Sequence, residues 1–153
     1  MYSTHIQAIT QFTLADAQLA ANLMQSIPEF DKPVSAEAML ERIGAAPALL
    51  LLCYVEDELA GFKLGYEKSP GEFYSWLGGV LPDFRKLGLA QSMLLTQEQW
   101  ASEQGYSLLK VKTRNSFPAM LSMLVQNRYQ IAAIQGEGVS LAEQKISLQK
   151  ALV

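Results

Sequence analysis

The sequence predicts an α+β fold in which a mixed, largely antiparallel central sheet is flanked by about four helices. Three observations support this class: helical and strand patterns alternate along the chain, three consecutive strands in its middle are joined by short turns, and its last third returns to alternating helix and strand. The 153 residues contain no internal repeat and no linker composition, so we expect a single domain over residues 1–153.

The first part of the chain predicts one strand and two helices. A short strand is expected over residues 6–9. Apolar residues spaced three and four apart predict an amphipathic helix over residues 16–27, which Pro28 ends. Ser35 is a good N-cap for a second helix through Ile43, because its hydroxyl accepts a hydrogen bond from a free amide of the first turn.

The middle of the chain predicts an antiparallel meander. Residues 49–55 are apolar at nearly every position, as expected of a strand that is buried on both faces. A tight turn at Asp57-Glu58 leads into a strand over 59–66, and the turn Ser69-Pro70-Gly71 leads into a strand over 73–81.

The clearest helix pattern follows the meander. Leu89, Met93 and Trp100 fall on one face of a helix over residues 89–104, and Gly105 supplies its C-terminal stop. The remaining elements are expected to be a strand, a helix and two strands, over residues 108–113, 117–127, 129–134 and 144–148.

Composition argues against several classes of protein. The net charge of −3 disfavours a nucleic-acid partner, because phosphate contacts need clustered Lys and Arg. The apolar run over 48–55 is too short to span a bilayer, and the N-terminus lacks a secretory signal, so we expect a cytoplasmic protein without a membrane partner. One cysteine, Cys53, and one histidine, His5, cannot build a Cys/His zinc site, and we expect no metal. Packing in the apolar core is the favoured role of Cys53, and a nucleophilic pair with His5 is the less favoured alternative.

The most informative segment is the junction between the strand ending near Leu81 and the helix that Gly88 opens. Glycine lets a ligand approach the backbone, and the first amides of a helix lack internal partners and carry partial positive charge. A pyrophosphate would suit this position, and Arg85 and Lys86 add formal charge. A plain strand-to-helix turn with two solvated cations is the alternative.

The segment Arg85-Lys-Leu-Gly-Leu-Ala90 resembles the [RQ]-x-x-G-x-[GA] acetyl-CoA loop of GNAT acetyltransferases. The order of the predicted elements is typical of the same family from about Ile6 to Leu148. The resemblance implies that acetyl-CoA is the co-substrate. Its pyrophosphate would bind backbone amides of the loop, its pantetheine arm would pair with a strand, and Asn115 would lie beside the arm. The residues implied are Val80, Leu81, Arg85, Lys86, Leu87, Gly88, Leu89, Ala90 and Asn115.

The same resemblance implies that the strand carrying Val80 diverges from the strand carrying Val111 and leaves a wedge for the thioester. Gly78-Gly79 suits this region, because glycines within a strand often mark a bulge or a close backbone approach. A structural kink without a ligand is the alternative for these glycines. For Asn115 the alternative is a turn or capping residue.

Direct transfer to a primary amine is the reaction that the family implies. Because the amine must first lose a proton, a carboxylate near the wedge would act as base, and the amide of Val80 or Leu81 would stabilise the oxyanion. The candidate catalytic residues are Glu72, Tyr74 and Ser75, with Glu29 and Asp31 on the expected acceptor loop. A structural or solvated role is the alternative for each.

One position departs from the family. Many members carry a tyrosine five residues before the final aromatic of the last helix, where it protonates the leaving thiolate. Counting back from Tyr129 gives Leu124, and Arg128 replaces the family glycine. A water or Tyr129 is the expected substitute.

The sequence therefore predicts an N-acetyltransferase that acts on an unidentified small-molecule or peptide amine. Members of the family often pair as dimers, so a homodimer is one expectation. The alternatives are an acyl-CoA-binding sensor without turnover, which the missing tyrosine favours, and, more distantly, a structural protein with a vestigial fold.

Overall fold

A seven-stranded sheet and four α-helices form the part of the chain, residues 2–152, that the structure describes; the structure is a computed structural model. The helices are α1 (Leu14–Gln25), α2 (Ala36–Ile43), α3 (Leu89–Glu103) and α4 (Pro118–Gln126). The strands are β1 (Thr4–Ile9), β2 (Ala48–Val55), β3 (Glu58–Ser69), β4 (Glu72–Val80), β5 (Leu108–Arg114), β6 (Gln130–Gln135) and β7 (Lys145–Ala151). Two short 3₁₀ helices that the sequence did not predict are η1 (Pro82–Phe84) and η2 (Leu141–Glu143).

The strands are ordered β1-β2-β3-β4-β5-β7-β6. The β4–β5 pair is parallel, and the other neighbouring pairs are antiparallel. The predicted fold class is therefore confirmed, and β2, β3 and β4 form the expected meander. No helix within the described residues has both the length and the apolar character required to cross a membrane.

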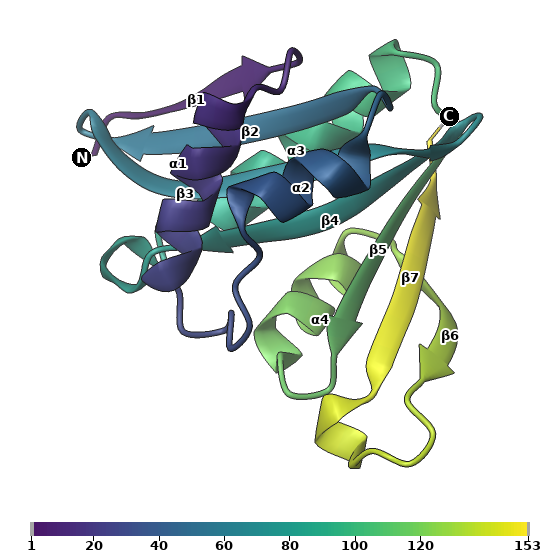
Figure 1. Cartoon of the computed structure of the whole chain (residues 1–153). Helices are drawn as coiled ribbons and strands as arrows, with labels where there is room; N and C mark the ends of the chain where they lie inside the picture. Colours follow the sequence, from purple (N-terminus) through teal and green to yellow (C-terminus); the bar gives the residue numbers. More distant parts are fainter. Residues whose placement is uncertain (1, 153) are drawn as a thin grey trace.

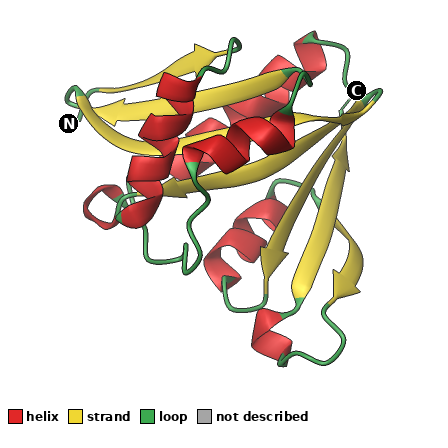
Figure 2. Cartoon of the chain, viewed as in Figure 1, coloured by secondary structure: helices red, strands yellow, loops and turns green. Residues whose placement is uncertain are grey.

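Helices lie on both faces of the sheet (Figure 2), and each face carries an apolar layer. One layer packs α1 and α2 against the sheet and includes Leu50, Phe62 and Leu64. The other contains α3 and α4 residues together with Leu49 and Leu51. Because successive residues of a strand point to opposite faces, the apolar run of β2 serves both layers, and this explains why it lacks alternation.

Caps determine where the N-terminal helices begin. Thr13 and Asp16 form a capping box, in which each side chain accepts a hydrogen bond from the backbone N–H of the other. Helix α1 therefore starts at Leu14, two residues earlier than its apolar pattern indicated. Ser35 caps α2 as predicted, and its hydroxyl accepts from the Ala38 N–H at 3.1 Å.

The turn between β2 and β3 lies one residue earlier than predicted. Glu56 and Asp57 have φ values of 48° and 70°, so both central residues of the hairpin turn are left-handed. Aspartate tolerates this region better than most residues do, which suits Asp57. The prediction placed the turn at Asp57-Glu58, but Glu58 is the first residue of β3.

Strands β4 and β5 separate partway along their length. They are paired only from Glu72 with Leu108 to Ser75 with Val111. Beyond Ser75 the two strands diverge in a V, and α4 lies on the β5 side of the opening (Figure 1). From Trp76 to Val80, β4 therefore has no strand partner on its β5 side, although it stays paired with β3.

Candidate active site

The opening between β4 and β5 leads into a cavity of about 890 Å³. Its walls come from β3, β4, β5 and α4, from the start of α3 and from the loop between α1 and α2. Residues far apart in the sequence, such as Phe30, Val80 and Met120, thus share one concave surface. A large cavity of this kind, lined by apolar groups and a few polar ones, is the usual form of a small-molecule site.

One end of the cavity is formed by the loop before α3. Lys86 and Gly88 have left-handed φ values of 66° and 77°, and α3 starts at Leu89 with its first amides free of intrahelical partners. Left-handed residues beside such amides turn successive N–H groups toward one concave side, which favours an anion. A Cβ added to Gly88 would meet no heavy atom within 4 Å, so a ligand has room there.

The Arg85 side chain is already engaged within the protein. Its guanidinium binds the Glu29 carboxylate through two contacts, of 2.6 and 3.0 Å, and its Nε donates to the Val80 carbonyl at 3.2 Å. The same guanidinium lowers the pKa of Glu29 below its ordinary value. Arg85 therefore ties the α3 loop to the loop after α1, and the backbone is left as the main anion-binding group.

Six of the nine residues expected to contact coenzyme A line the cavity: Val80, Arg85, Lys86, Gly88, Leu89 and Ala90. The structure does not bring the other three there. Leu81 donates its N–H to the Ala60 carbonyl at 2.8 Å, and Leu87 is exposed to solvent. Asn115 donates its side-chain amide to the Leu141 carbonyl at 2.9 Å, which is the turn role that the sequence left open.

The engaged amide of Leu81 also narrows the choice of oxyanion donor. Neighbouring residues of a strand point their N–H groups to opposite sides. Since the Leu81 N–H points to β3, that of Val80 points into the opening. Val80, not Leu81, is therefore placed to donate a hydrogen bond within the cavity.

Two of the three candidate catalytic residues lie in the cavity. Tyr74 and Ser75 line it, on opposite faces of β4, and burial raises the pKa of the Tyr74 hydroxyl. Glu72 lies outside, where β4 is still paired with β5. Its carboxylate forms an ion pair with Lys110 at 2.6 Å and accepts a hydrogen bond from Ser69. These partners lower the pKa of Glu72, and we do not assign it a catalytic role.

The glycine pair of β4 permits close approach and is not the site of the bulge. The register shifts between the pairs Leu64–Leu77 and Gly65–Ser75, which places the extra residue at Trp76. A Cβ on Gly79 would lie 3.0 to 3.3 Å from side-chain atoms of Ile27 and Phe30, so a larger residue there would push against the end of the α1 layer.

Comparison with known proteins identifies the family. A model of the acetyltransferase (GNAT) family matches residues 17–124. The chain belongs to this family. No curated protein sequence matches the chain significantly. Solved structures that share the GNAT fold include the ribosomal-protein-S18-alanine N-acetyltransferase of Escherichia coli, with a TM-score of 0.83 and 17% identity over 98% of this chain and 94% of that one.

Two further similar structures contain the coenzyme. A Bacillus subtilis acetyltransferase in complex with CoA has a TM-score of 0.71 and 17% identity, over 99% of this chain and 100% of that one. The Salmonella typhimurium acetyltransferase yncA, with acetyl-CoA, has a TM-score of 0.72 and 13% identity, over 97% and 94% of the two chains. These likenesses confirm the predicted GNAT fold over nearly the whole chain.

Neither residue at the departure from the GNAT pattern reaches the cavity. Leu124 is fully buried in the layer beneath α3 and α4. Tyr129, considered as a substitute acid, is 3% exposed and donates its hydroxyl to Glu98 at 2.8 Å. Burial and this bond raise the pKa of Tyr129, so it is not available as a proton donor in the cavity. Helix α4 instead presents Phe117, Met120 and Met123.

Sequence reasoning missed two buried polar residues of the cavity, Lys63 and Thr113. Lys63 on β3 is 7% exposed, and the buried Thr113 hydroxyl on β5 has no hydrogen-bond partner. A lone cation between Phe62 and Leu64 in a central strand was a signal for Lys63, because buried lysines are rare unless they are paired or functional.

Cysteine and metal chemistry find no support in the described part of the chain. Burial raises the pKa of the Cys53 thiol to about 11, which opposes formation of a nucleophilic thiolate. His5 stacks on the Tyr54 ring at the outer edge of the sheet. Within residues 2–152, no three His, Cys, Asp or Glu side chains are arranged to hold a metal ion.

Proposed function

We propose that this GNAT protein is an N-acetyltransferase that moves the acetyl group of acetyl-CoA directly to a primary amine. The observation that carries the proposal is the divergence of β4 from β5, because it opens a cavity that has an anion-binding loop at one end. The complexes of similar structures with CoA and acetyl-CoA support the same ligand here.

The residues present fit this ligand in three ways. The left-handed residues Lys86 and Gly88 and the first amides of α3 suit the pyrophosphate. The Val80 N–H suits a carbonyl of the pantetheine arm or the thioester oxygen. The orphaned Thr113 hydroxyl offers a further hydrogen bond inside the cavity.

The acceptor amine enters on the α1–α2 side of the sheet. The loop after α1 contributes Glu29, Phe30 and Asp31 to the cavity, and β4 contributes Tyr74 and Trp76. Because Arg85 holds the Glu29 carboxylate, the Asp31 carboxylate, acting directly or through water, takes the proton that the amine must lose before it attacks. The Val80 N–H stabilises the negative charge that develops on the thioester oxygen.

The experiment measures two quantities separately. Calorimetry with CoA and acetyl-CoA measures binding, and release of CoA from acetyl-CoA is then followed with a panel of small amines and peptide N-termini. The proposal expects binding together with acceptor-dependent release of CoA and a product heavier by one acetyl group. Absence of CoA binding would overturn the proposed function.

A binding module without turnover is the second candidate function. It is favoured by Leu124, which replaces the usual acid and is buried, and by Tyr129, which is held by Glu98. Tight acetyl-CoA binding without release across the amine panel would favour this candidate over the enzyme.

A further inference from the structure

Lys63 is a buried cation without a recorded partner in the described part of the chain. Its side chain lines the cavity and makes neither a hydrogen bond nor an ion pair there, although the residue is only 7% exposed. A buried charge without a partner is costly, so such groups are normally paired or hold a ligand. Lys63 is therefore a second polar group, with Thr113, that lacks a protein partner inside the same cavity.

The absence of a side chain at Gly78 leaves space for the Lys63 side chain to enter the opening between β4 and β5. Lys63 pairs in register with Gly78 of β4, and a Cβ on Gly78 would lie 3.4 Å from the Lys63 Cγ. The lysine stem therefore lies on the same side of the sheet as the missing side chain of Gly78. A Cβ at this position would therefore contact the lysine stem, and it would lie 3.2 Å from the Phe62 carbonyl oxygen.

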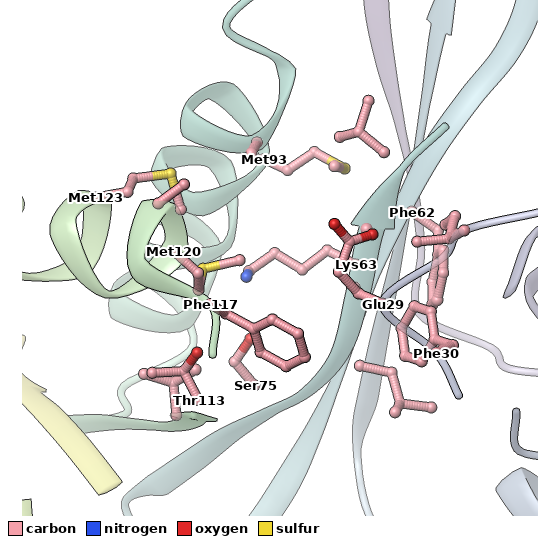
Figure 3. A pocket seen from close by; sticks show the side chains of 18 of the residues that line it. Glu29, Phe30, Phe62, Lys63, Ser75, Met93, Thr113, Phe117, Met120 and Met123 are labelled. Carbon is pink, nitrogen blue, oxygen red and sulfur yellow. The ribbon is translucent and has the colours of Figure 1, made fainter. Parts of the chain in front are cut away.

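Beyond Gly78 the lysine extends toward α4. In Figure 3 the Lys63 side chain points toward Met120, and Ser75, Thr113 and Phe117 lie together at one side of its tip. Helix α4 carries no ionisable side chain, and Val111 and Thr113 are the buried residues of β5 in this region. The ammonium thus ends in a largely apolar part of the cavity.

Within residues 2–152, the carboxylate whose charge raises the pKa of Lys63 is that of Glu98 on α3. This carboxylate is fully engaged elsewhere: one oxygen forms an ion pair with Lys150 at 2.8 Å, and the other accepts the Tyr129 hydroxyl at 2.8 Å. Glu98 is therefore not the direct partner of Lys63, and the cation is left for something that enters the cavity.

We propose that the Lys63 ammonium faces the sulfur of bound coenzyme A and donates a proton to it when the thioester is cleaved. The inference rests on the proposed function. It assigns to β3 the proton donor that α4 lacks, because Leu124 and Tyr129 are both turned away from the cavity.

The position of Lys63 favours the CoA sulfur as its partner over a carboxylate on the acceptor molecule. Gly78, which pairs with Lys63, lies two residues from Val80, or about 7 Å along β4, so an extended lysine side chain can reach the sulfur of a thioester whose oxygen is held by the Val80 N–H. Lys63 also projects to the α3–α4 side, whereas Gly79 faces Ile27 and Phe30 on the acceptor side. The two roles therefore fall on opposite faces of β4.

The pKa of Lys63 suits proton transfer to a thiolate. Burial lowers it from 10.5 to about 8, and Glu98 opposes this change. A thiol has an ordinary pKa of about 8.5. The ammonium is thus mostly protonated at neutral pH, and its proton is shared almost evenly with a thiolate.

The step balances as follows. The amine nitrogen forms a bond to the carbonyl carbon, the C–S bond breaks and its electron pair goes to sulfur. Lys63 gives one proton to that sulfur and becomes a neutral amine. The proton that the attacking nitrogen releases goes to solvent through the loop carboxylate, and Lys63 recovers a proton from water before the next turnover.

The experiment titrates the thiol of bound CoA and does not require a known acceptor. Cys53→Ala is used as the background, because Cys53 is the only cysteine of the chain and the CoA thiol is then the only one that titrates. Thiolate absorbance is followed against pH, with desulfo-CoA as the blank. In this background the bound thiol is expected to have a pKa at least about one unit below that of the free thiol, a tenfold change in its ionisation constant.

Lys63→Met keeps the length of the side chain and removes the charge. It is expected to return the thiol pKa to the free value or above and to lower the rate of acetyl transfer with little effect on the KM for acetyl-CoA. Lys68→Met removes the same charge from an exposed side chain of β3 that does not line the cavity, and it is expected to leave the low thiol pKa in place.

Two results would overturn the assignment while leaving the proposed function intact. One is bound CoA whose thiol pKa is the same with Lys63 and with Lys63→Met. The other is a Lys63→Met variant whose only defect is a raised KM for amines that carry a carboxylate. Failure of CoA to bind the background protein would instead overturn the proposed function itself.

Discussion

At the scale of single residues, Lys63 combines a cost in folding with a place in the cavity. Burial lowers its pKa from 10.5 to about 8, which at about 1.4 kcal/mol for each pKa unit corresponds to about 3 kcal/mol at neutral pH. A stability cost of this kind is typical of residues kept for function. Gly88 is a second residue of the cavity that is not readily replaced, because its left-handed backbone is uncommon for other residues.

We expect Lys63→Met to raise the free energy of unfolding by about 3 kcal/mol at pH 7. Because the folded-state pKa of Lys63 lies below that of the unfolded chain, the unfolded protein binds more protons between pH 8 and 10.5. The stability of the parent protein therefore rises with pH in this window, and the advantage of the variant shrinks there. Urea unfolding at several pH values measures the difference.

Lys68→Met is the control, since its ammonium is exposed outside the cavity and its removal should give no gain of this size. A Lys63→Met advantage that stayed constant from pH 7 to 10.5 would contradict the buried cation.

Gly88→Glu is expected to weaken CoA binding by at least about 100-fold, because it adds a carboxylate where the phosphates would lie. Gly105→Glu is the matched control. Both glycines have left-handed φ values, 77° and 91°, and a Cβ on either would meet nothing within 4 Å. Each variant should lose about 1–2 kcal/mol of stability, but calorimetry should find CoA affinity lost only at Gly88. Equal affinities in the two variants would refute the loop assignment.

At the scale of elements, Arg85 joins the loop before α3 to the loop after α1. Its bonds to Glu29 and to the Val80 carbonyl connect the expected coenzyme site with the expected acceptor site. Both side chains of the ion pair are about 40% exposed, at 39% and 42%, so solvent screens their attraction. The link therefore serves to place the two loops more than to stabilise the fold.

Arg85→Ala is expected to change the free energy of unfolding by less than about 1 kcal/mol and to weaken CoA binding by less than about tenfold, because backbone amides carry the phosphate contacts. Calorimetry and urea unfolding measure the two effects, with Gly88→Glu as the comparison. A loss of affinity as large as that of Gly88→Glu would show that the guanidinium leaves Glu29 and binds the ligand.

At the scale of the whole molecule, the site exists because one strand pair is incomplete. β4 and β5 are joined from Glu72 to Ser75 and open beyond, so the backbone of β4 from 76 to 80 has one side without a strand partner. Two helical layers cover the sheet, with α1 and α2 on one face and α3 and α4 on the other.

CoA binding is therefore expected to slow backbone hydrogen exchange in β4 after Ser75 and in the loop over 85–90. Exchange in the exposed edge strand β6 should not change. Mass spectrometry of peptides with and without CoA measures this pattern. Protection spread evenly over the sheet would argue that the ligand stabilises the fold without occupying the opening.

The sequence by itself determined the element order, the meander and the loop before α3, because helix and strand periods and a helix start are local patterns. The resemblance of that loop to the GNAT family, and not these periods, pointed to six residues that line the cavity. Only the tertiary structure decided which side chains enter the cavity. It placed Lys63 there, paired Glu72 with Lys110 and turned Asn115 to Leu141. The physical reason is that these placements join segments far apart in the sequence: the β3–β4 register sets Lys63 opposite Gly78, the β4–β5 pairing brings Glu72 near Lys110, and Asn115 meets the distant Leu141.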